Sequence, residues 1–199
     1  PADWKDITAK FENPNKDRLA PAFVKEIADI VNAQAGDTLP VSAFNEYVDG
    51  TIPAGTSAYE KRGVAVKVPE WQADNCIQCN SCAFVCPHAA IRPFLLTDEE
   101  AANAPEGLKL QDGKATFKAY KFALSVSVLD CTGCGNCADV CPSKEKALIM
   151  KPLQSQEAEQ ANFDYLHAHI GYKDNVQPKA QNVKNAQFAQ PLFEFSGAC

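Results

Sequence analysis

The 199-residue chain has no long apolar run, only three histidines, a single methionine and no excess of basic residues. Its longest nearly apolar stretch, residues 122–129, is interrupted by two serines, whereas a membrane helix needs about 20 apolar residues. We therefore expect no membrane span. Nineteen Lys and Arg against twenty-five Asp and Glu give a formal net charge of -6. Without a dense basic stretch, nucleic acid is not an expected partner.

The N-terminus has neither a basic stretch followed by an apolar core nor a small-residue cleavage site. Nothing therefore marks the chain for export, and we expect a cytoplasmic protein. The chain also lacks an initiating methionine, because its only methionine is Met150. This predicts a processed chain or a piece cut from a longer protein.

Cysteine is abundant, with nine residues. An odd count without an export signal argues against a disulfide framework and favours metal or redox chemistry. Eight of the nine fall in two short blocks, residues 76–86 and 131–141, and the ninth, Cys199, is the last residue. The blocks match one another closely enough to be an internal repeat.

Both blocks follow the pattern C-x-x-C-x-x-C-x-x-x-C-P. This pattern is typical of bacterial two-cluster ferredoxins, in which the fourth cysteine of each run binds the other cluster. The sequence therefore predicts two 4Fe-4S clusters with crossed ligands. One is expected on Cys76, Cys79, Cys82 and Cys141, and the other on Cys131, Cys134, Cys137 and Cys86.

Other interpretations of the blocks fit the spacing less well. Structural zinc uses four ligands that are usually split into two pairs, rather than four cysteines within one short run. Disulfides and inert core thiols are weaker alternatives. His88, which follows the first block, could tune a cluster or relay a proton, but a solvated loop histidine is the simpler interpretation. His167 and His169 have no ligand spacing.

The expected fold is α+β: a ferredoxin-like two-cluster 4Fe-4S domain of two pseudo-symmetric halves, flanked by extended interdomain segments. Strand-like runs at 64–68 and 122–129 precede the two cysteine blocks, and each half is expected to be a strand, a loop, a helix and a strand. Phe84 and Val140 occupy neighbouring places in the two blocks and are expected to pack in the core.

The chain is expected to divide into three stretches. Residues 1–60 are expected to be an interdomain linker with one helix, residues 21–35, capped by Gly36 and followed by extended, turn-rich chain. Residues 61–153 form the cluster domain, with an insertion at about 93–121. Residues 154–199 are expected to hold a short helix, 154–168, and the start of another domain.

The insertion carries two turn signals. Thr97 and Glu100 form a capping-box pattern that predicts a short helix ended by Pro105, and Asp112-Gly113 predicts a hairpin turn. We expect this insertion at the surface. Four lysines against one aspartate make it locally basic, which fits either a solvated hairpin or docking of an acidic electron carrier. These lysines are Lys109, Lys114, Lys118 and Lys121.

With both blocks placed, the whole chain resembles an interior segment of the pyruvate:ferredoxin (flavodoxin) oxidoreductase family. Matching stretches approach the first block, pass through both cluster sites and reach the last residue. They are Gly36–Phe44, Asp49–Thr56, Glu60–Ala65, Ile91–Leu96, Leu129–Pro142 and Gln190–Cys199.

The resemblance implies an electron-relay segment of an enzyme that converts pyruvate and CoA to acetyl-CoA and carbon dioxide. Electrons would pass through the 4Fe-4S clusters to ferredoxin or flavodoxin. Thiamine diphosphate, Mg and a third 4Fe-4S cluster would be bound by the remaining domains of a homodimeric enzyme. The resemblance also implies that Cys199 is a ligand of that third cluster, and it adds an anaerobic organelle such as a hydrogenosome as an alternative location.

A second hypothesis keeps the clusters without the enzyme. The chain would then be a free-standing ferredoxin-like carrier or an electron-wire subunit. No catalytic residue is expected within the chain under either hypothesis, because no phosphate loop, Ser/His/Asp set or supported carboxylate pair is present.

Overall fold

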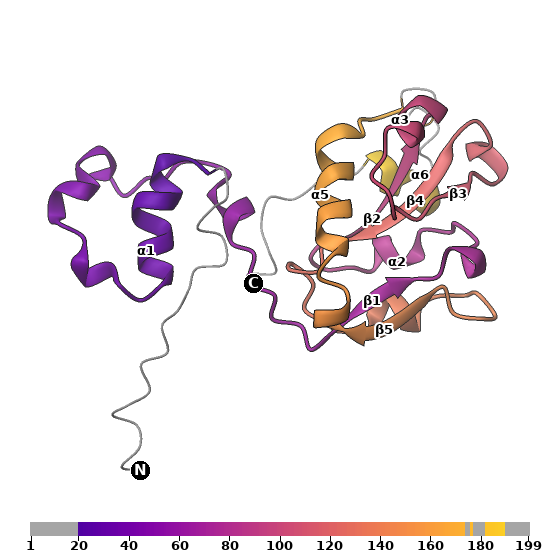
Figure 1. Ribbon diagram of the computed structural model, residues 1–199, viewed down its shortest axis with the longest axis horizontal. Coiled ribbons are helices and arrows are strands. Elements are labelled where there is room, and N and C mark those ends of the chain that lie inside the picture. Colours follow the sequence, from indigo (N-terminus) through magenta and orange to yellow (C-terminus); the bar gives the residue numbers. More distant parts are fainter. Residues whose placement is uncertain (1–19, 174–175, 177–181, 190–199) are drawn as a thin grey trace, which may run out of the picture. The chain divides into compact units, whose positions relative to one another are not determined.

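The computed structural model of the chain describes residues 20–173, 176 and 182–189 (Figure 1). The chain divides into two compact units, which meet in sequence between Lys61 and Arg62. Both cysteine blocks belong to the second unit. None of the helices among the described residues is long and apolar enough to cross a membrane.

The first unit is built around one helix. A π-helical stretch, η2 (Val24–Ala28), continues into α1 (Asp29–Asn32). Val24 and Ile27 are buried, and the ring of Phe23 meets Tyr47 edge to face with centroids 4.8 Å apart. The predicted helix is confirmed, although it ends three residues earlier than expected.

The predicted C-terminal cap of this helix is wrong. Gln34 rather than Gly36 takes the left-handed conformation, with φ 59°. Gly36 instead begins a short 3-10 helix, Gly36–Thr38, and a second one covers Val41–Tyr47. The expected extended chain at 36–56 is thus partly helical, because turn-forming residues also suit the tight turns of a 3-10 helix.

The second unit contains two small antiparallel sheets. In one, β1 (Lys67–Trp71) pairs with β5 (Leu148–Pro152). In the other, β4 (Lys121–Val126) lies between β2 (Ile91–Leu96) and β3 (Gln111–Asp112). The strand before each cysteine block therefore pairs with the strand after the other block. This pairing brings the two blocks together, and it confirms a mixed α and β fold.

Helix α5 (Glu159–His169) lies beside the three-stranded sheet, as Figure 1 shows. It buries Phe163 and Leu166 in an apolar cluster with Phe94, Leu96 and Ala123. The predicted helix is confirmed with its start moved from residue 154 to 159. A larger core cluster includes residues of both sheets and several of the cysteines, among them Trp71, Cys76, Cys82, Phe122 and Cys137.

The capping box of the insertion is confirmed. Helix α3 (Asp98–Ala102) has Thr97 as N-cap, and the amide of Glu100 donates to the Thr97 hydroxyl. In return the Glu100 carboxylate accepts a 2.7 Å bond from the Thr97 amide. The helix gives way to Asn103, two residues before Pro105.

The hairpin of the insertion differs from the expected two-residue turn. Residues 113–120 connect β3 to β4, and they include a 3-10 helix, Ala115–Phe117. Gly113 is required because a Cβ there would lie 1.9 Å from the carbonyl oxygen of Phe117. Phe117 itself is fully buried. The insertion therefore lies at the surface, with Lys114 and Lys118 exposed, and Phe117 anchors it in the core.

Two further expectations fail. Phe84 and Val140 are 61% and 41% exposed, so they are not core residues. Each comes at or just after the end of a very short helix that buries its cysteine and leaves the large apolar side chain at its end exposed. Helix α6 (Val183–Ala189) was also not expected. Its Phe188 packs edge to face on Phe117, with centroids 4.9 Å apart.

Candidate metal centres

The two cysteine loops share an unusual backbone conformation. Gln78 and Gly133, at matched places in the two blocks, have φ 58° and 73°. Two residues on, Asn80 and Gly135 have φ 60° and 83°, and each is the N-cap of a short helix. These helices are α2 (Ser81–Phe84) and α4 (Asn136–Asp139). Left-handed residues at these positions curl each loop around its cysteines.

Backbone N–H groups point at the cysteine sulfurs. The amides of Gln78 and Gly133 donate to the Sγ atoms of Cys76 and Cys131, both at 3.4 Å. A third bond of 3.4 Å runs from the amide of Ala147 to Cys141 Sγ. N–H donors of this kind stabilise sulfur that carries negative charge, as a thiolate ligand does.

Each loop borders a hollow that also receives a cysteine from the other block. The first hollow is lined by Cys76, Cys79, Cys82 and Cys141. The second is lined by Cys131, Cys134, Cys137 and Cys86. The remaining lining is mostly apolar, with Phe122 and Leu148 in the first hollow and Val126 and Met150 in the second.

The eight cysteines of the two blocks, all within the described part of the chain, are free thiols. Within the described ranges, no group of three or more His, Cys, Asp or Glu side chains is arranged to hold a single metal ion. Cys199, the predicted ligand of a third cluster, lies outside the described residues.

Burial dominates the electrostatics of these thiols. It raises the pKa of Cys76, Cys82 and Cys131 above the ordinary value, and it raises the pKa of Cys137 to about 12. Neighbouring cysteines add to the effect because several thiolates in one hollow repel one another. These four buried thiols therefore favour the neutral form unless a cationic group binds and displaces their protons.

The insertion covers the first loop. The Gln78 side chain is fully buried, and its amide nitrogen donates to Gln111 Oε1 and to the Asp112 carbonyl, both at 2.8 Å. Its oxygen accepts a 2.7 Å bond from the amide of Lys114. The ammonium of Lys114 donates to the Cys76 carbonyl at 2.8 Å. One side chain thus ties the hairpin to the cysteine loop.

The second loop is covered in a different way. Gly133 stands where the first loop has Gln78, and a Cβ there would lie 2.6 Å from the carbonyl oxygen of Lys67. The chain leading into β1 therefore fills the space that the hairpin fills at the first loop. The second loop is also more open, because Cys134 is exposed whereas Cys79 is half-buried.

Helix α6 also closes over the first loop. The side-chain amide nitrogen of Asn80 donates to the carbonyl of Lys184 at 2.8 Å. The Lys184 ammonium lies 4.6 Å from the centre of the Phe117 ring. Burial lowers the pKa of Lys184, while Cys79 and Cys76 counteract part of that effect. This places a second cation, besides Lys114, beside the first hollow.

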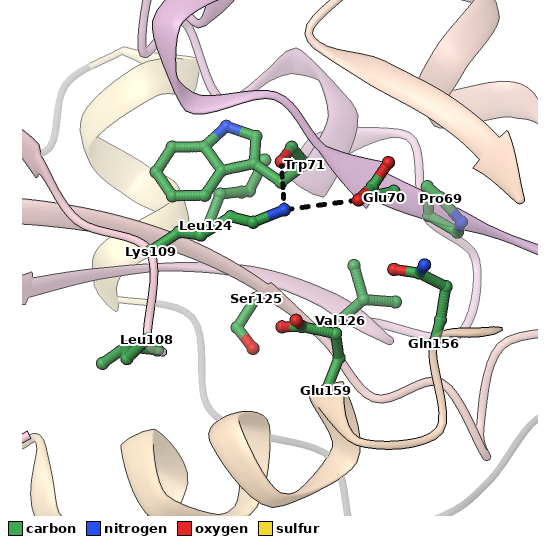
Figure 2. A pocket seen from close by; sticks show the side chains of 10 residues that line it. All are labelled: Pro69, Glu70, Trp71, Leu108, Lys109, Leu124, Ser125, Val126, Gln156 and Glu159. Carbon is green, nitrogen blue, oxygen red and sulfur yellow. Dashed lines mark hydrogen bonds and ion pairs between the residues drawn. The ribbon is translucent and has the colours of Figure 1, made fainter. Parts of the chain in front are cut away.

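The insertion is not a free basic patch. Lys109 binds Glu70 at 3.4 Å and the carbonyl of Trp71 at 3.2 Å, at the pocket drawn in Figure 2. Lys121 pairs with Asp112. Because Lys114 donates to the Cys76 carbonyl, three of the four lysines have partners in this unit. The hairpin is nevertheless exposed, as expected of a solvated one, and docking of an acidic carrier stays a prediction.

His88 lies in a turn and is only partly solvated. It is half-buried and lines the second hollow, with its Nδ1 3.4 Å from the hydroxyl oxygen of Thr132. The sequence alone favoured the solvated interpretation because it does not show that the chain after Cys86 returns to the second loop. His167 and His169 lie on α5, near Phe163 and Tyr165, and neither lines a hollow.

Two family matches divide the chain between them. Residues 75–145 match a family described as a 4Fe-4S dicluster domain. Residues 9–65 match a family described as a domain of unknown function.

Longer proteins match the whole chain. A pyruvate-flavodoxin oxidoreductase of Enterobacter agglomerans is 55% identical over all of the chain and 16% of its own length. A pyruvate:ferredoxin oxidoreductase of Moorella thermoacetica is 49% identical over all of the chain and 17% of its own length. A pyruvate dehydrogenase [NADP(+)] of Cryptosporidium parvum is 48% identical over 89% of the chain and 9% of its own length.

The chain thus spans about a sixth of the length of the oxidoreductases that it matches in full. Because the similarity runs through both units and is not confined to the cysteine blocks, it is more specific than the ferredoxin motif alone. The chain carries a 4Fe-4S dicluster domain and is, along its full length, a homologue of an interior segment of the pyruvate:ferredoxin and pyruvate-flavodoxin oxidoreductases.

Proposed function

We propose that the chain is the electron-relay segment of a pyruvate:ferredoxin or pyruvate-flavodoxin oxidoreductase. One observation carries the proposal. Each hollow gathers three cysteines from one block and the fourth from the other, as the two-cluster motif predicts. In such a site the protein supplies thiolate ligands and N–H donors, and it excludes water.

The ligand sets that we propose are those expected from the sequence. Cys76, Cys79, Cys82 and Cys141 hold one 4Fe-4S cluster, and Cys131, Cys134, Cys137 and Cys86 hold the other. The observed donors fit such a group, because N–H bonds to sulfur suit the ligands of an anionic cluster better than they suit neutral thiols. The matched positive φ values of the loops and the exchange of strands between the halves support a pseudo-symmetric domain.

When bound, the clusters supply one-electron oxidation and reduction. The residues of the chain determine how that chemistry is used. Gln78, Gly133 and Ala147 direct amide protons at ligand sulfurs, which stabilises added negative charge. Lys114 and Lys184 add positive charge beside the first site. The lid formed by the insertion and α6 keeps water from the first loop, while the second loop stays more open.

The substrate chemistry belongs to the rest of the protein. We propose that pyruvate and CoA are converted in the remaining domains of the same homodimeric enzyme, with thiamine diphosphate, Mg and a third 4Fe-4S cluster. Residues 1–60 would link these domains to the cluster domain, 61–153. Residues 154–199 would lead into the thiamine-diphosphate domain and deliver Cys199 to the third cluster. Ferredoxin or flavodoxin would be the acceptor, and the cytoplasm or an anaerobic organelle the location.

The alternative is a free-standing ferredoxin-like carrier or wire subunit. Full-length similarity to segments of much longer oxidoreductases favours the enzyme segment over this alternative. The relative named for NADP(+) also carries this segment. That suits a relay whose terminal acceptor is set elsewhere in the protein.

Metal analysis tests the proposal. Protein prepared without oxygen is expected to contain about eight iron and eight sulfide in this segment, and its two reduced clusters should couple magnetically because the crossed ligands hold them close together. Iron and sulfide are counted chemically, with the clusters of other domains subtracted by means of a variant that lacks all eight block cysteines. Two zinc ions and no sulfide would contradict the proposal.

A further inference from the structure

A buried tryptophan next to the first site has a donor that no acceptor uses. Trp71 is 5% exposed, and its indole Nε1 is buried without a hydrogen-bond partner among the described residues. A buried indole N–H normally finds an acceptor, because leaving it unpaired costs about 1–3 kcal/mol. The site therefore needs an acceptor that neutral protein groups do not provide.

The polar groups nearest to Trp71 do not face its indole nitrogen. Figure 2 shows the indole nitrogen on the ring edge directed away from the ion pair of Lys109 and Glu70. The backbone carbonyl of Trp71 is taken by Lys109. The ring itself is fixed by Phe122, which it meets with centroids 5.9 Å apart.

The sulfur of Cys76 is the acceptor that the site offers. Trp71 ends β1, and Phe122, on which its ring packs, lines the first hollow together with Cys76. Burial raises the pKa of the Cys76 thiol, and the Trp71 side chain is the largest influence in the opposite direction. A thiol is only a weak acceptor, whereas a thiolate accepts a strong, charge-assisted bond. The indole is therefore placed for a sulfur that carries negative charge.

We propose that Trp71 donates its indole N–H to the Cys76 sulfur when a cluster occupies the first site, and that this bond raises the reduction potential of that cluster. Hydrogen bonds to ligand sulfur stabilise the reduced form, which carries one more negative charge. Trp71 thus acts as a positioning and tuning residue, and the inference rests on the proposed ligand set.

The second half of the domain supplies an internal comparison. Val126 stands five residues before Cys131, as Trp71 stands five before Cys76. Val126 lines the second hollow and has no donor to offer. The effect is therefore specific to the first cluster, and removal of the indole is expected to leave the second one unchanged.

The test is a redox titration of the full-length enzyme followed by electron paramagnetic resonance. The signals are assigned with variants that remove one crossed ligand at a time. Trp71→Phe is expected to shift the reduction equilibrium of the first cluster about tenfold toward the oxidised form, a fall of about 59 mV for a one-electron couple. The potential of the second cluster should not move.

A second replacement separates the bond from the packing. Exchanging the indole of Trp71 for benzothiophene by unnatural amino-acid incorporation keeps the shape of the ring and removes only the N–H. It is expected to lower the potential as Trp71→Phe does.

The outcomes distinguish the inference from the proposed function. An enzyme that binds both clusters but keeps the first potential in the benzothiophene variant overturns the role of Trp71 alone. An enzyme without iron and sulfide in this segment overturns the cluster assignment itself. Should Trp71→Phe fail to fold, the benzothiophene variant still decides the matter.

Discussion

At the scale of single residues, one pair of matched positions in the two blocks has the same backbone conformation but different residues. Both Gln78 and Gly133 take a positive φ. At the first block, the insertion accepts the side chain of Gln78 and satisfies its polar atoms. At the second, the carbonyl of Lys67 occupies the space where a Cβ would stand. The two blocks therefore differ at this position because the insertion covers the first loop and the chain at Lys67 covers the second.

This contrast predicts that the two glycines of the second loop differ in importance. Gly133→Ala is strained at φ 73° and also places Cβ against the Lys67 carbonyl and Ala65. Gly135→Ala, at φ 83°, meets no atom within 4 Å. It therefore suffers only backbone strain of about 1–3 kcal/mol. We expect Gly133→Ala to lose the second cluster and Gly135→Ala to keep it.

Iron and sulfide analysis checks this prediction. The segment should hold about four iron in Gly133→Ala and about eight in Gly135→Ala. Equal iron contents in the two variants would show that the approach of Lys67 does not matter. Loss of the first cluster rather than the second in Gly133→Ala would show that the site assignment is wrong.

At the scale of secondary-structure elements, local signals in the sequence predicted local structure well. The capping-box pattern at Thr97 predicted helix α3, and the apolar spacing in the first unit predicted the helix of that unit. Hydrogen bonds between residues three or four apart depend little on tertiary context. The strands before each block also lie near their expected places, shifted by one to three residues.

Elements whose position depends on distant contacts were predicted poorly. Helix α6 has only seven residues, too few for a periodic signal, and Phe188 holds it through contacts with Phe117 and Phe122. The hairpin of the insertion is exposed as expected, but its anchoring by Phe117 was not predicted, because no local signal marks it. Its role depends on bonds to Gln78, more than thirty residues away in the chain.

Helix α3 gives a prediction about pH. Burial favours the protonated form of Glu100, but hydrogen bonds from Lys173 and Thr97 outweigh it and hold the pKa of the carboxyl below its ordinary value. The ammonium of Lys173 lies 2.7 Å from Glu100 Oε1. A lowered pKa stabilises the folded form above the ordinary value of 4.5. The stabilisation is lost as the pH falls through the folded-state pKa.

Glu100→Gln keeps a capping side chain and removes the charge. We expect amides 97–103 to exchange about two- to fivefold faster at pH 7, as an ion pair worth up to about 1 kcal/mol requires. The difference should shrink as the pH falls below 4.5. Hydrogen–deuterium exchange read by mass spectrometry measures it, with the exposed Glu99→Gln as control. A difference that persists unchanged at low pH would contradict the role of the charge.

At the scale of the whole molecule, the paired strands explain why the cysteine blocks cooperate. β1 pairs with β5, and β2 pairs with β4, so each half of the domain is completed by a strand of the other. That exchange carries Cys141 to the first hollow and Cys86 to the second. The spacing of the cysteines alone predicted this grouping, because that spacing reflects how the thiolates bind the two clusters.

The flanks could be predicted less fully. Similarity to the oxidoreductases extends over residues beyond the dicluster domain, but the sequence holds no ligand set there apart from Cys199. The roles proposed for residues 1–60 and 154–199 rest on the relatives.

The central claim is that ligands cross between the two blocks, and a pair of single substitutions in the full-length protein tests it most directly. Cys141→Ala should damage the cluster held by Cys76, Cys79 and Cys82, and Cys86→Ala should damage the other one. Electron paramagnetic resonance of each reduced variant, with iron counted in parallel, identifies the cluster that is lost. Damage confined in each case to the cluster of the variant's own block would contradict the account.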